Sequence, residues 1–102
     1  MDLLAAKDWM SFWRRRMRYL ISKKFKKNFD KLPSLVKKQF SRRRKLFESE
    51  PTHPLLHNHQ LIGKYGDCRS FNVTGDVRVI FSHLDAKTIH LIDIGTHSQL
   101  YG

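Results

Sequence analysis

The sequence predicts an α+β domain in which two N-terminal α-helices pack on one face of an antiparallel β-sheet, in the order β-α-α-β-β-β. Three observations lead to this class: apolar residues recur at helical spacing in residues 23–48, they alternate with polar residues in 68–94, and a short strand-like run precedes both. With 102 residues and 40% apolar content, the chain suits one core. We expect one domain over residues 17–102, after an extension of residues 1–16 that is disordered or helical.

The helical half follows a strand at residues 19–21. Ser22 is a suitable N-cap for the first helix, and Pro33 ends that helix and can open a second one that runs to about Glu48. The predicted apolar face of the first helix consists of Phe25, Phe29 and Leu32. The predicted buried side of the second consists of Leu35, Val36, Phe40 and either Leu46 or Phe47.

A hairpin follows in the second half. Residues 68–73 and 76–82 flank Thr74-Gly75, whose spacing suits a tight two-residue turn. In that register Phe71 pairs with Arg78, and three charged residues share one face: Arg69, Asp76 and Arg78. Such a face is either a solvent-exposed Arg–Asp pair or a phosphate clamp.

The last predicted strand covers residues 88–94, after a turn at residues 85–87. Alternation places Thr88, His90, Ile92 and Ile94 on one of its faces. We expect the sheet to carry the helices on one face and to leave the other face free for a ligand.

The loop of residues 49–67 shows neither period and contains Pro51, Pro54, Gly63 and Gly66. Long loops are uncommon in compact domains and tend to be functional. This loop, which also holds three histidines, is therefore the first place to look for chemistry.

The net charge of +11 lies in the first half of the chain. Residues 1–50 hold 16 Lys and Arg against 5 Asp and Glu, whereas residues 51–102 hold 4 of each kind. A polyanion is the natural partner of such a surface, because each phosphate that is neutralised releases counterions. The alternatives are solvated helix faces and an acidic protein that wraps the domain.

Cysteine content and hydropathy narrow the class further. Cys68 is the only cysteine, so no internal disulfide can form, and the scattered histidines offer no paired zinc-ligand spacing. No apolar run approaches the ~20 residues that span a bilayer. We expect a cytoplasmic protein that needs no metal or cofactor.

The extension combines large apolar residues with Arg14-Arg15-Arg16. This composition suits an amphipathic segment for a partner or a membrane surface. Met17 is an alternative start of the protein.

Six histidines are a high count for this length, and imidazole can both take and give a proton near neutrality. His53 and His97 are the best candidates, because a proline or glycine close to each fixes the backbone. For both, the alternative is a turn histidine bonded to the backbone. His57 and His59 in the loop come next.

Several motifs stand in a particular order: His53-Pro54-Leu55, Gly63-Lys64-Tyr65, Arg69-Ser70, residues 74–81 and the terminal residues 95–102. Together they resemble the RelE/ParE toxin superfamily, most closely its YafQ-like mRNA interferases. The resemblance covers residues 17–102, and the family's fold agrees with the predicted one.

This resemblance implies a toxin of a type II toxin–antitoxin system that enters the ribosome, cleaves mRNA and inhibits translation. In such enzymes the 2′-OH of the substrate attacks the adjacent phosphate without a metal, which restricts the reaction to RNA. The implied partners are the ribosome, mRNA and a cognate antitoxin with an acidic, partly disordered segment. The resemblance also implies that the toxin–antitoxin complex binds operator DNA, and that the antitoxin makes this contact. A ParE-like gyrase inhibitor without nuclease activity is the alternative, and an inactive binding relative is a third possibility.

Carried over by position, the implied catalytic residues are His53, Asp76, Arg78, His97 and Tyr101. The two histidines would be general acid and base in unassigned order, Asp76 an orienting group or additional base, Arg78 the ligand of the scissile phosphate, and Tyr101 a platform for a base. Contacts to RNA and ribosome are expected from Lys23, Lys27, Lys37, Arg42, Arg43, Arg44, Lys64 and Arg69. Asn72 stands where the closest relatives have a further histidine, so the roles of acid and base stay open, and His57 or His59 could substitute.

Overall fold

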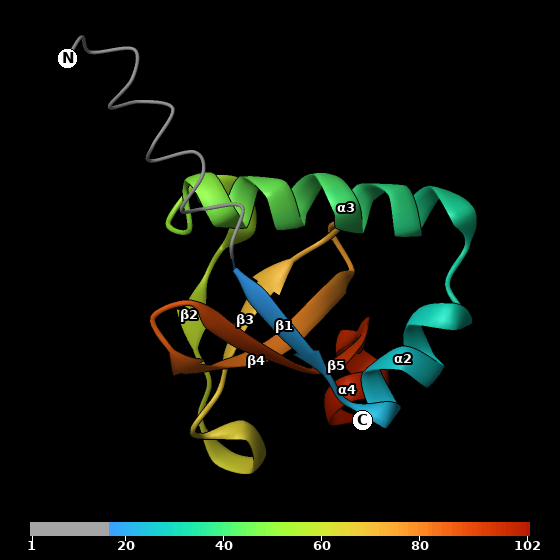
Figure 1. Cartoon of the computed structure of the whole chain (residues 1–102). Coiled ribbons are helices and arrows are strands. Elements are labelled where there is room, and N and C mark those ends of the chain that lie inside the picture. The colour runs from blue at the N-terminus through green and yellow to red at the C-terminus, as the bar shows by residue number, and fades with distance from the viewer. Residues whose placement is uncertain (1–16) are drawn as a thin grey trace, which may run out of the picture.

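The computed structural model describes residues 17–102 and has the predicted α+β class. Its strands are β1 (Arg18–Ile21), β2 (His59–Gln60), β3 (Arg69–Asn72), β4 (Val77–Asp85) and β5 (Thr88–Thr96), in the spatial order β1-β5-β4-β3-β2. Its helices are α2 (Lys23–Asp30), α3 (Ser34–Ser49) and α4 (His97–Tyr101). Two 3-10 turns, η1 (Pro54–Leu56) and η2 (Gly63–Tyr65), lie with β2 in the segment expected to be an irregular loop (Figure 1).

The two N-terminal helices begin where the sequence predicts. Ser22 caps α2, because its hydroxyl accepts a hydrogen bond from Phe25 N at 3.0 Å, and α3 starts directly after Pro33. Phe40 is buried as expected. The expectation for Leu35 is wrong: it is 78% exposed, because the buried face of α3 runs through Val36, Phe40 and Phe47 and leaves Leu35 to the side. Figure 1 shows α3 lying across the sheet.

The main core lies between α3, α2 and one face of the sheet. Phe47 of α3 stacks on Phe71 with ring centroids 5.2 Å apart, and it meets Phe81 edge-on at 5.0 Å. A smaller apolar cluster lies on the opposite face and consists of Leu61, Ile80 and Leu100. Leu100 belongs to α4, so the second face is partly covered and not free as predicted.

The hairpin between β3 and β4 differs from the predicted one. Asn72, not Phe71, lies opposite Arg78, and residues 73–76 form a longer connection. The Thr74 hydroxyl accepts hydrogen bonds from the backbone N–H groups of Asp76 and Val77, which stabilises this connection over a two-residue turn. Because a one-residue change of register moves side chains to the other face, the predicted face shared by Arg69 and Arg78 is wrong.

The sheet is mixed, and not antiparallel throughout as predicted. β1 runs parallel to β5, because the chain leaves β1 through both helices and returns to the far side of the sheet before β5 is formed. The outer edge of β1 is therefore an edge of the whole sheet.

A β-bulge in β5 breaks the predicted alternation. Ile80 lies opposite Asp93 and Phe81 opposite Leu91, so Ile92 is the extra residue. Beyond the bulge the faces exchange, and Ile94 enters the main core although strict alternation placed it on the other face. The buried carboxylate of Asp93 accepts a hydrogen bond from Asn28 of α2 at 2.7 Å.

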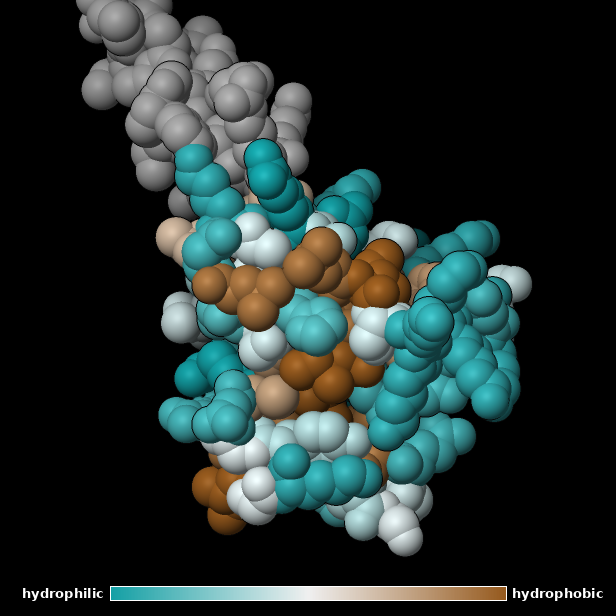
Figure 2. Space-filling view, turned by 60° about the horizontal axis from the view of Figure 1, so that its bottom comes forward, coloured by the Kyte–Doolittle hydropathy of each residue, from teal (hydrophilic) through white to brown (hydrophobic). Residues whose placement is uncertain are grey.

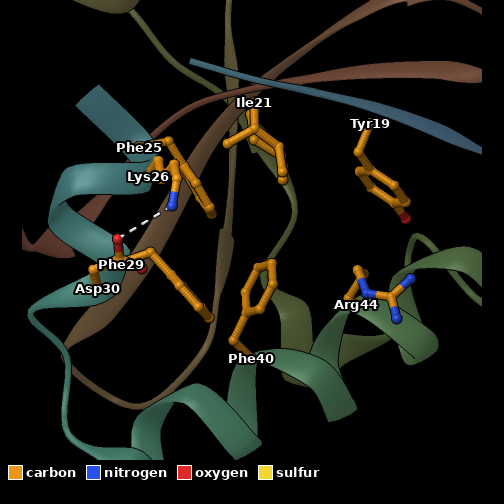
Figure 3. A pocket seen from close by; sticks show the side chains of 9 residues that line it. Tyr19, Ile21, Phe25, Lys26, Phe29, Asp30, Phe40 and Arg44 are labelled. Atoms are coloured by element: carbon orange, nitrogen blue, oxygen red, sulfur yellow. Dashed lines mark hydrogen bonds and ion pairs between the residues drawn. The ribbon is translucent and has the colours of Figure 1, made fainter. Parts of the chain in front are cut away.

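An apolar pocket of about 420 Å³ opens between β1, α2 and α3. Figure 3 shows Phe29 and Phe40 pointing into it, with the Lys26–Asp30 ion pair at its rim. Hydrophobic surface also gathers in the middle of the face in Figure 2, framed by hydrophilic residues. None of the helices in residues 17–102 is long and apolar enough to cross a membrane.

Candidate active site

The sheet face opposite α3 gathers buried polar atoms that have no hydrogen-bond partner within residues 17–102. They are Tyr65 Oη, Ser70 Oγ, Asn72 Oδ1 and Arg78 Nε. Ser70 lies opposite Ile80 and Asn72 opposite Arg78, so these side chains leave the sheet on the same side, and Tyr65 packs against the Ile80 cluster there. Because buried polar groups are nearly always paired, this orphan cluster indicates a site for a polar ligand.

Helix α4 places two further candidates beside the orphan cluster. Thr96 and Gln99 form a capping box, in which Thr96 Oγ1 accepts from Gln99 N at 3.2 Å and Gln99 Oε1 accepts from Thr96 N at 2.8 Å. Glycine at residue 95 leaves room for this cap, because a Cβ there would lie 2.9 Å from Gln99 Oε1 and would displace it. His97 and Tyr101 are then one turn apart, and their tilted rings are in contact with centroids separated by 4.8 Å.

The electrostatics connect Tyr101 to Arg78. Burial raises the pKa of the Tyr101 phenol, and the charge of Arg78 partly offsets this increase. Arg78 also lies between Asn72 on β3 and Gly95 on β5 in the sheet register. The guanidinium group, which belongs to the orphan cluster, is therefore also close to α4.

Asp76 lies at the same end of the sheet as His97. Val77 is the register partner of Thr96, so Asp76 comes one residue before a paired position and His97 one residue after it. Asp76 is exposed within the connection between β3 and β4. Its side chain has no hydrogen bond to His97 in the described part of the chain.

His53 occupies a structural position at the start of η1. Its Nδ1 accepts a hydrogen bond from Leu55 N at 3.1 Å, which is the turn-histidine arrangement. In the neutral ring the proton is then on Nε2, which can donate but not accept. No hydrogen bond or ring contact joins His53 to His97 among residues 17–102, and Leu56 of the same turn enters the helix-side core.

The two loop histidines differ in what they offer. His59 Nδ1 lies 2.7 Å from the carbonyl oxygen of His57, which can only accept, so Nδ1 carries the proton and Nε2 keeps a free lone pair. His59 is also the register partner of Ser70 and leaves the sheet on the side of the orphan cluster. Of the two substitutes considered for the histidine missing at Asn72, His59 is thus the one on this face.

The expected RNA-contacting residues are divided by the fold. Arg42 is exposed on α3, across the sheet from the orphan cluster, and Lys23 and Lys27 are exposed on α2. Several others have intramolecular roles. Arg43 donates to Leu55 O, Arg44 pairs with Glu48, Arg69 donates to Asn58, and Lys37 donates to Asp30 O. Lys64 lies 5.2 Å from the Tyr65 ring centroid, on the side of the candidate site.

Sequence reasoning missed Lys24, Ser70 and the hydroxyl of Tyr65. Lys24 pairs with Asp93 at 3.3 Å, and hydrogen bonding to Asp93 raises its pKa, with a further contribution from nearby Tyr65. No local signal in the sequence distinguishes Lys24 from the other lysines of α2. The capping pattern Thr96-x-x-Gln99, in contrast, is a sequence signal for the start of α4. Among residues 17–102, no three His, Cys, Asp or Glu side chains are grouped to hold a metal ion.

Comparison with known proteins identifies the family. Residues 17–102 match the model of the bacterial toxin of type II toxin–antitoxin systems, YafQ. The chain belongs to this YafQ toxin family. No curated protein matches the chain significantly in sequence.

Solved structures agree with this membership. YafQ in the E. coli DinJ–YafQ toxin–antitoxin complex has a TM-score of 0.66 and 21% identity, and the match covers 85% of this chain and 99% of that one. HP0894 from Helicobacter pylori has a TM-score of 0.64 and 26% identity, and the match covers 83% of this chain and 99% of that one. A chain of the archaeal RelE–RelB complex from Pyrococcus horikoshii has a TM-score of 0.63 and 26% identity, and the match covers 82% of this chain and 98% of that one. As a type II toxin, this YafQ-family protein has a cognate antitoxin as its partner.

Proposed function

We propose that this YafQ-family toxin is a metal-independent, ribosome-dependent mRNA endoribonuclease, and that the orphan cluster with His97 and Tyr101 is its active site. The observation that carries the proposal is the group of buried polar atoms without partners on one sheet face. A phosphodiester with a 2′-OH offers donors and acceptors to pair with them. The large positive charge of the chain supports a nucleic-acid substrate.

The reaction proceeds by attack of the 2′-OH on the adjacent phosphorus. The O2′–P bond forms and the P–O5′ bond breaks, which leaves a 2′,3′-cyclic phosphate and a 5′-OH. A base takes the proton of the 2′-OH, and an acid gives a proton to O5′.

Side chains around α4 supply these steps. His97 is one of the two proton-transfer groups, and Arg78 stabilises the negative charge that grows on the phosphate. The second proton-transfer group is His53, once its Nδ1 leaves Leu55 N, or His59, whose Nε2 lone pair is free. Tyr101 stacks on a substrate base, and Asp76 orients a histidine.

The partners follow from charge. We infer that the antitoxin uses an acidic, partly disordered segment, because the toxin surface that meets RNA is basic. In this proposal the complex of both proteins binds operator DNA through the antitoxin.

His97→Ala tests the proposed function. We expect at least ~10²-fold slower cleavage of ribosome-bound mRNA, as for removal of a general acid or base, with ribosome binding retained. The measurement is single-turnover cleavage with mapping of the new 5′ ends. His90→Ala, on the part of β5 opposite Ser82, is the matched control and should cleave at the normal rate.

The chemical groups at the ends of the cleaved RNA fragments give the second measurement. A 5′-OH and a cyclic phosphate, together with resistance of mRNA that has a 2′-deoxy nucleotide at the cut, would establish 2′-OH attack. Growth arrest with intact mRNA and a supercoiling defect would instead establish the ParE-like function and contradict the proposal.

A further inference from the structure

Tyr65 carries a hydroxyl for which the described part of the fold provides no well-formed hydrogen bond. Its oxygen is buried and has no hydrogen-bond partner within residues 17–102, although the ring packs against the cluster of Leu61, Ile80 and Leu100. Phenylalanine would fill the same space without leaving a polar atom unpaired. The hydroxyl therefore requires a reason other than packing.

The surroundings of Tyr65 are both aromatic and cationic. Tyr101 meets the Tyr65 ring edge-to-face with centroids 5.9 Å apart, and Lys64 Nζ lies 5.2 Å from the centroid. Lys24 is the second cation. Its partner Asp93 lies opposite Ile80, a member of the cluster against which Tyr65 packs, and Tyr65 contributes to the raised pKa of this lysine. These residues come from α2, η2 and α4, so only the tertiary structure brings them together.

An ion pair fixes the position of Lys24. The ammonium group of Lys24 lies 3.3 Å from the buried carboxylate of Asp93, and this pair occupies one of the three N–H donors of the lysine. An ammonium group and a phenolic O–H side by side suit a phosphate oxygen, which accepts several hydrogen bonds at once. Tyr101 separates this pair from His97, whose ring centroid lies 4.8 Å from the Tyr101 centroid.

We propose that Lys24 and Tyr65 form a second phosphate subsite, which holds the mRNA phosphate next to the one that is cleaved. The Tyr65 hydroxyl and the Lys24 ammonium group donate to oxygens of this neighbouring phosphate, while Tyr101 stacks on the base between the two phosphates. The proposal rests on the proposed nuclease function. Because the neighbouring phosphate does not change charge during cleavage, the subsite contributes to substrate binding and not to the chemical step.

The decisive variant is Tyr65→Phe, which keeps the ring and its packing. Single-turnover cleavage of ribosome-bound mRNA is expected to show a KM about tenfold higher, as for loss of a hydrogen bond to a charged group, with kcat unchanged. Tyr19→Phe is the matched control, since that hydroxyl donates to Glu48 at 2.5 Å far from α4, and its KM should equal that of the parent. An unchanged KM in Tyr65→Phe overturns the inference.

Chemically modified mRNA substrates identify the phosphate that Tyr65 and Lys24 bind. A neutral methylphosphonate is introduced at one uncleaved mRNA linkage at a time. Only at the linkage next to the cut should the KM of the parent rise about tenfold. The further rise for Tyr65→Phe should be smaller there, because Lys24 is then the only remaining partner of that phosphate. Equal rises in KM for the parent and for Tyr65→Phe at every linkage would contradict the assignment. This outcome is also expected if Tyr65 contacts ribosomal RNA instead of mRNA. Lys24→Gln should behave as Tyr65→Phe does, and Lys26→Gln as the parent.

Failure of this inference differs from failure of the proposed function. If the parent protein does not cleave mRNA, the proposed function is wrong and the inference with it. If the parent cleaves and the KM of Tyr65→Phe is normal, only the subsite is wrong. Comparison of the melting temperatures of Tyr65→Phe and the parent shows whether the variant is folded.

Discussion

Hydrogen-bond direction separates two histidines of the loop, His53 and His59. The Nδ1 atom of His53 accepts from a backbone N–H, whereas the Nδ1 atom of His59 faces a carbonyl oxygen. The first ring therefore offers only a donor, and the second keeps a free lone pair on Nε2. A general base needs such a lone pair, so His59 needs no rearrangement to serve as one and His53 does.

Arg78 gives a test at the residue scale. Arg78→Lys keeps the charge but loses the planar fork that can bind two phosphate oxygens, so we expect kcat to fall by ~10²-fold with a smaller change in KM. Single-turnover kinetics measure both. Arg18→Lys, an exposed strand arginine on β1, is the control and should change neither. A purely raised KM would show that Arg78 binds substrate without assisting the reaction.

Tyr101 gives a test of pH dependence. Burial raises its pKa above the ordinary value of about 10, so the phenol stays protonated throughout pH 5–9 and cannot act as a base there. Tyr101→Phe should therefore leave the shape of the pH–rate profile unchanged. Tyr101→Ala, which lacks the stacking ring, should raise KM about tenfold. Loss of a limb of the profile in Tyr101→Phe would assign proton transfer to this residue.

At the scale of elements, the bulge in β5 joins α2 to the sheet. It turns the buried carboxylate of Asp93 toward Asn28 and Lys24 of α2, and the same carboxylate accepts from Ile94 N at 2.8 Å. The position of α2 and that of the proposed phosphate subsite thus depend on one side chain.

Removal of that side chain is expected to cost stability. Asp93→Ala leaves the amide of Asn28 without its partner and should lower the free energy of unfolding by about 3 kcal/mol. Urea unfolding followed by circular dichroism measures this. Asp30→Ala, which removes an exposed pair to Lys26, should cost less than about 0.5 kcal/mol. Equal losses would show that Asp93 is not an anchor.

The elements with strong local signals were predicted and those with weak signals were not. Ser22 and Pro33 mark the helix boundaries through chemistry that acts within a few residues, and both are confirmed. The register of Arg78 depends on hydrogen bonds to Thr74, and the exchange of faces at Ile94 depends on pairing with β4. Those choices are made between strands, so alternation along one strand could not show them.

At the scale of the whole molecule, the positive charge is distributed on more than one side. Arg42 lies on the helix side of the sheet, and the candidate active site lies on the other. Since mRNA at the active site cannot also lie along α3, the α3 surface is expected to meet ribosomal RNA.

Salt dependence tests this division. Replacement of Lys23, Lys27 and Arg42 together by glutamine should weaken ribosome binding and lower the slope of log K against log salt by up to about 3, with kcat unchanged. Arg43 and Arg44, already bonded to Leu55 O and Glu48, should change the slope less when they are replaced. A slope that is flat in the parent protein would contradict an electrostatic contact.

The sequence by itself determined the helix pair, the basic first half and the motifs that carry the family resemblance, because caps, period and composition are local properties. The motif comparison also indicated Arg78, His97 and Tyr101. Only the tertiary structure decided that Tyr65, Ser70 and Asn72 share a face with Arg78, and that Lys24 reaches the same place through its pair with Asp93. Sheet register and the docking of α2 bring these groups together, and both depend on contacts between residues far apart in the chain.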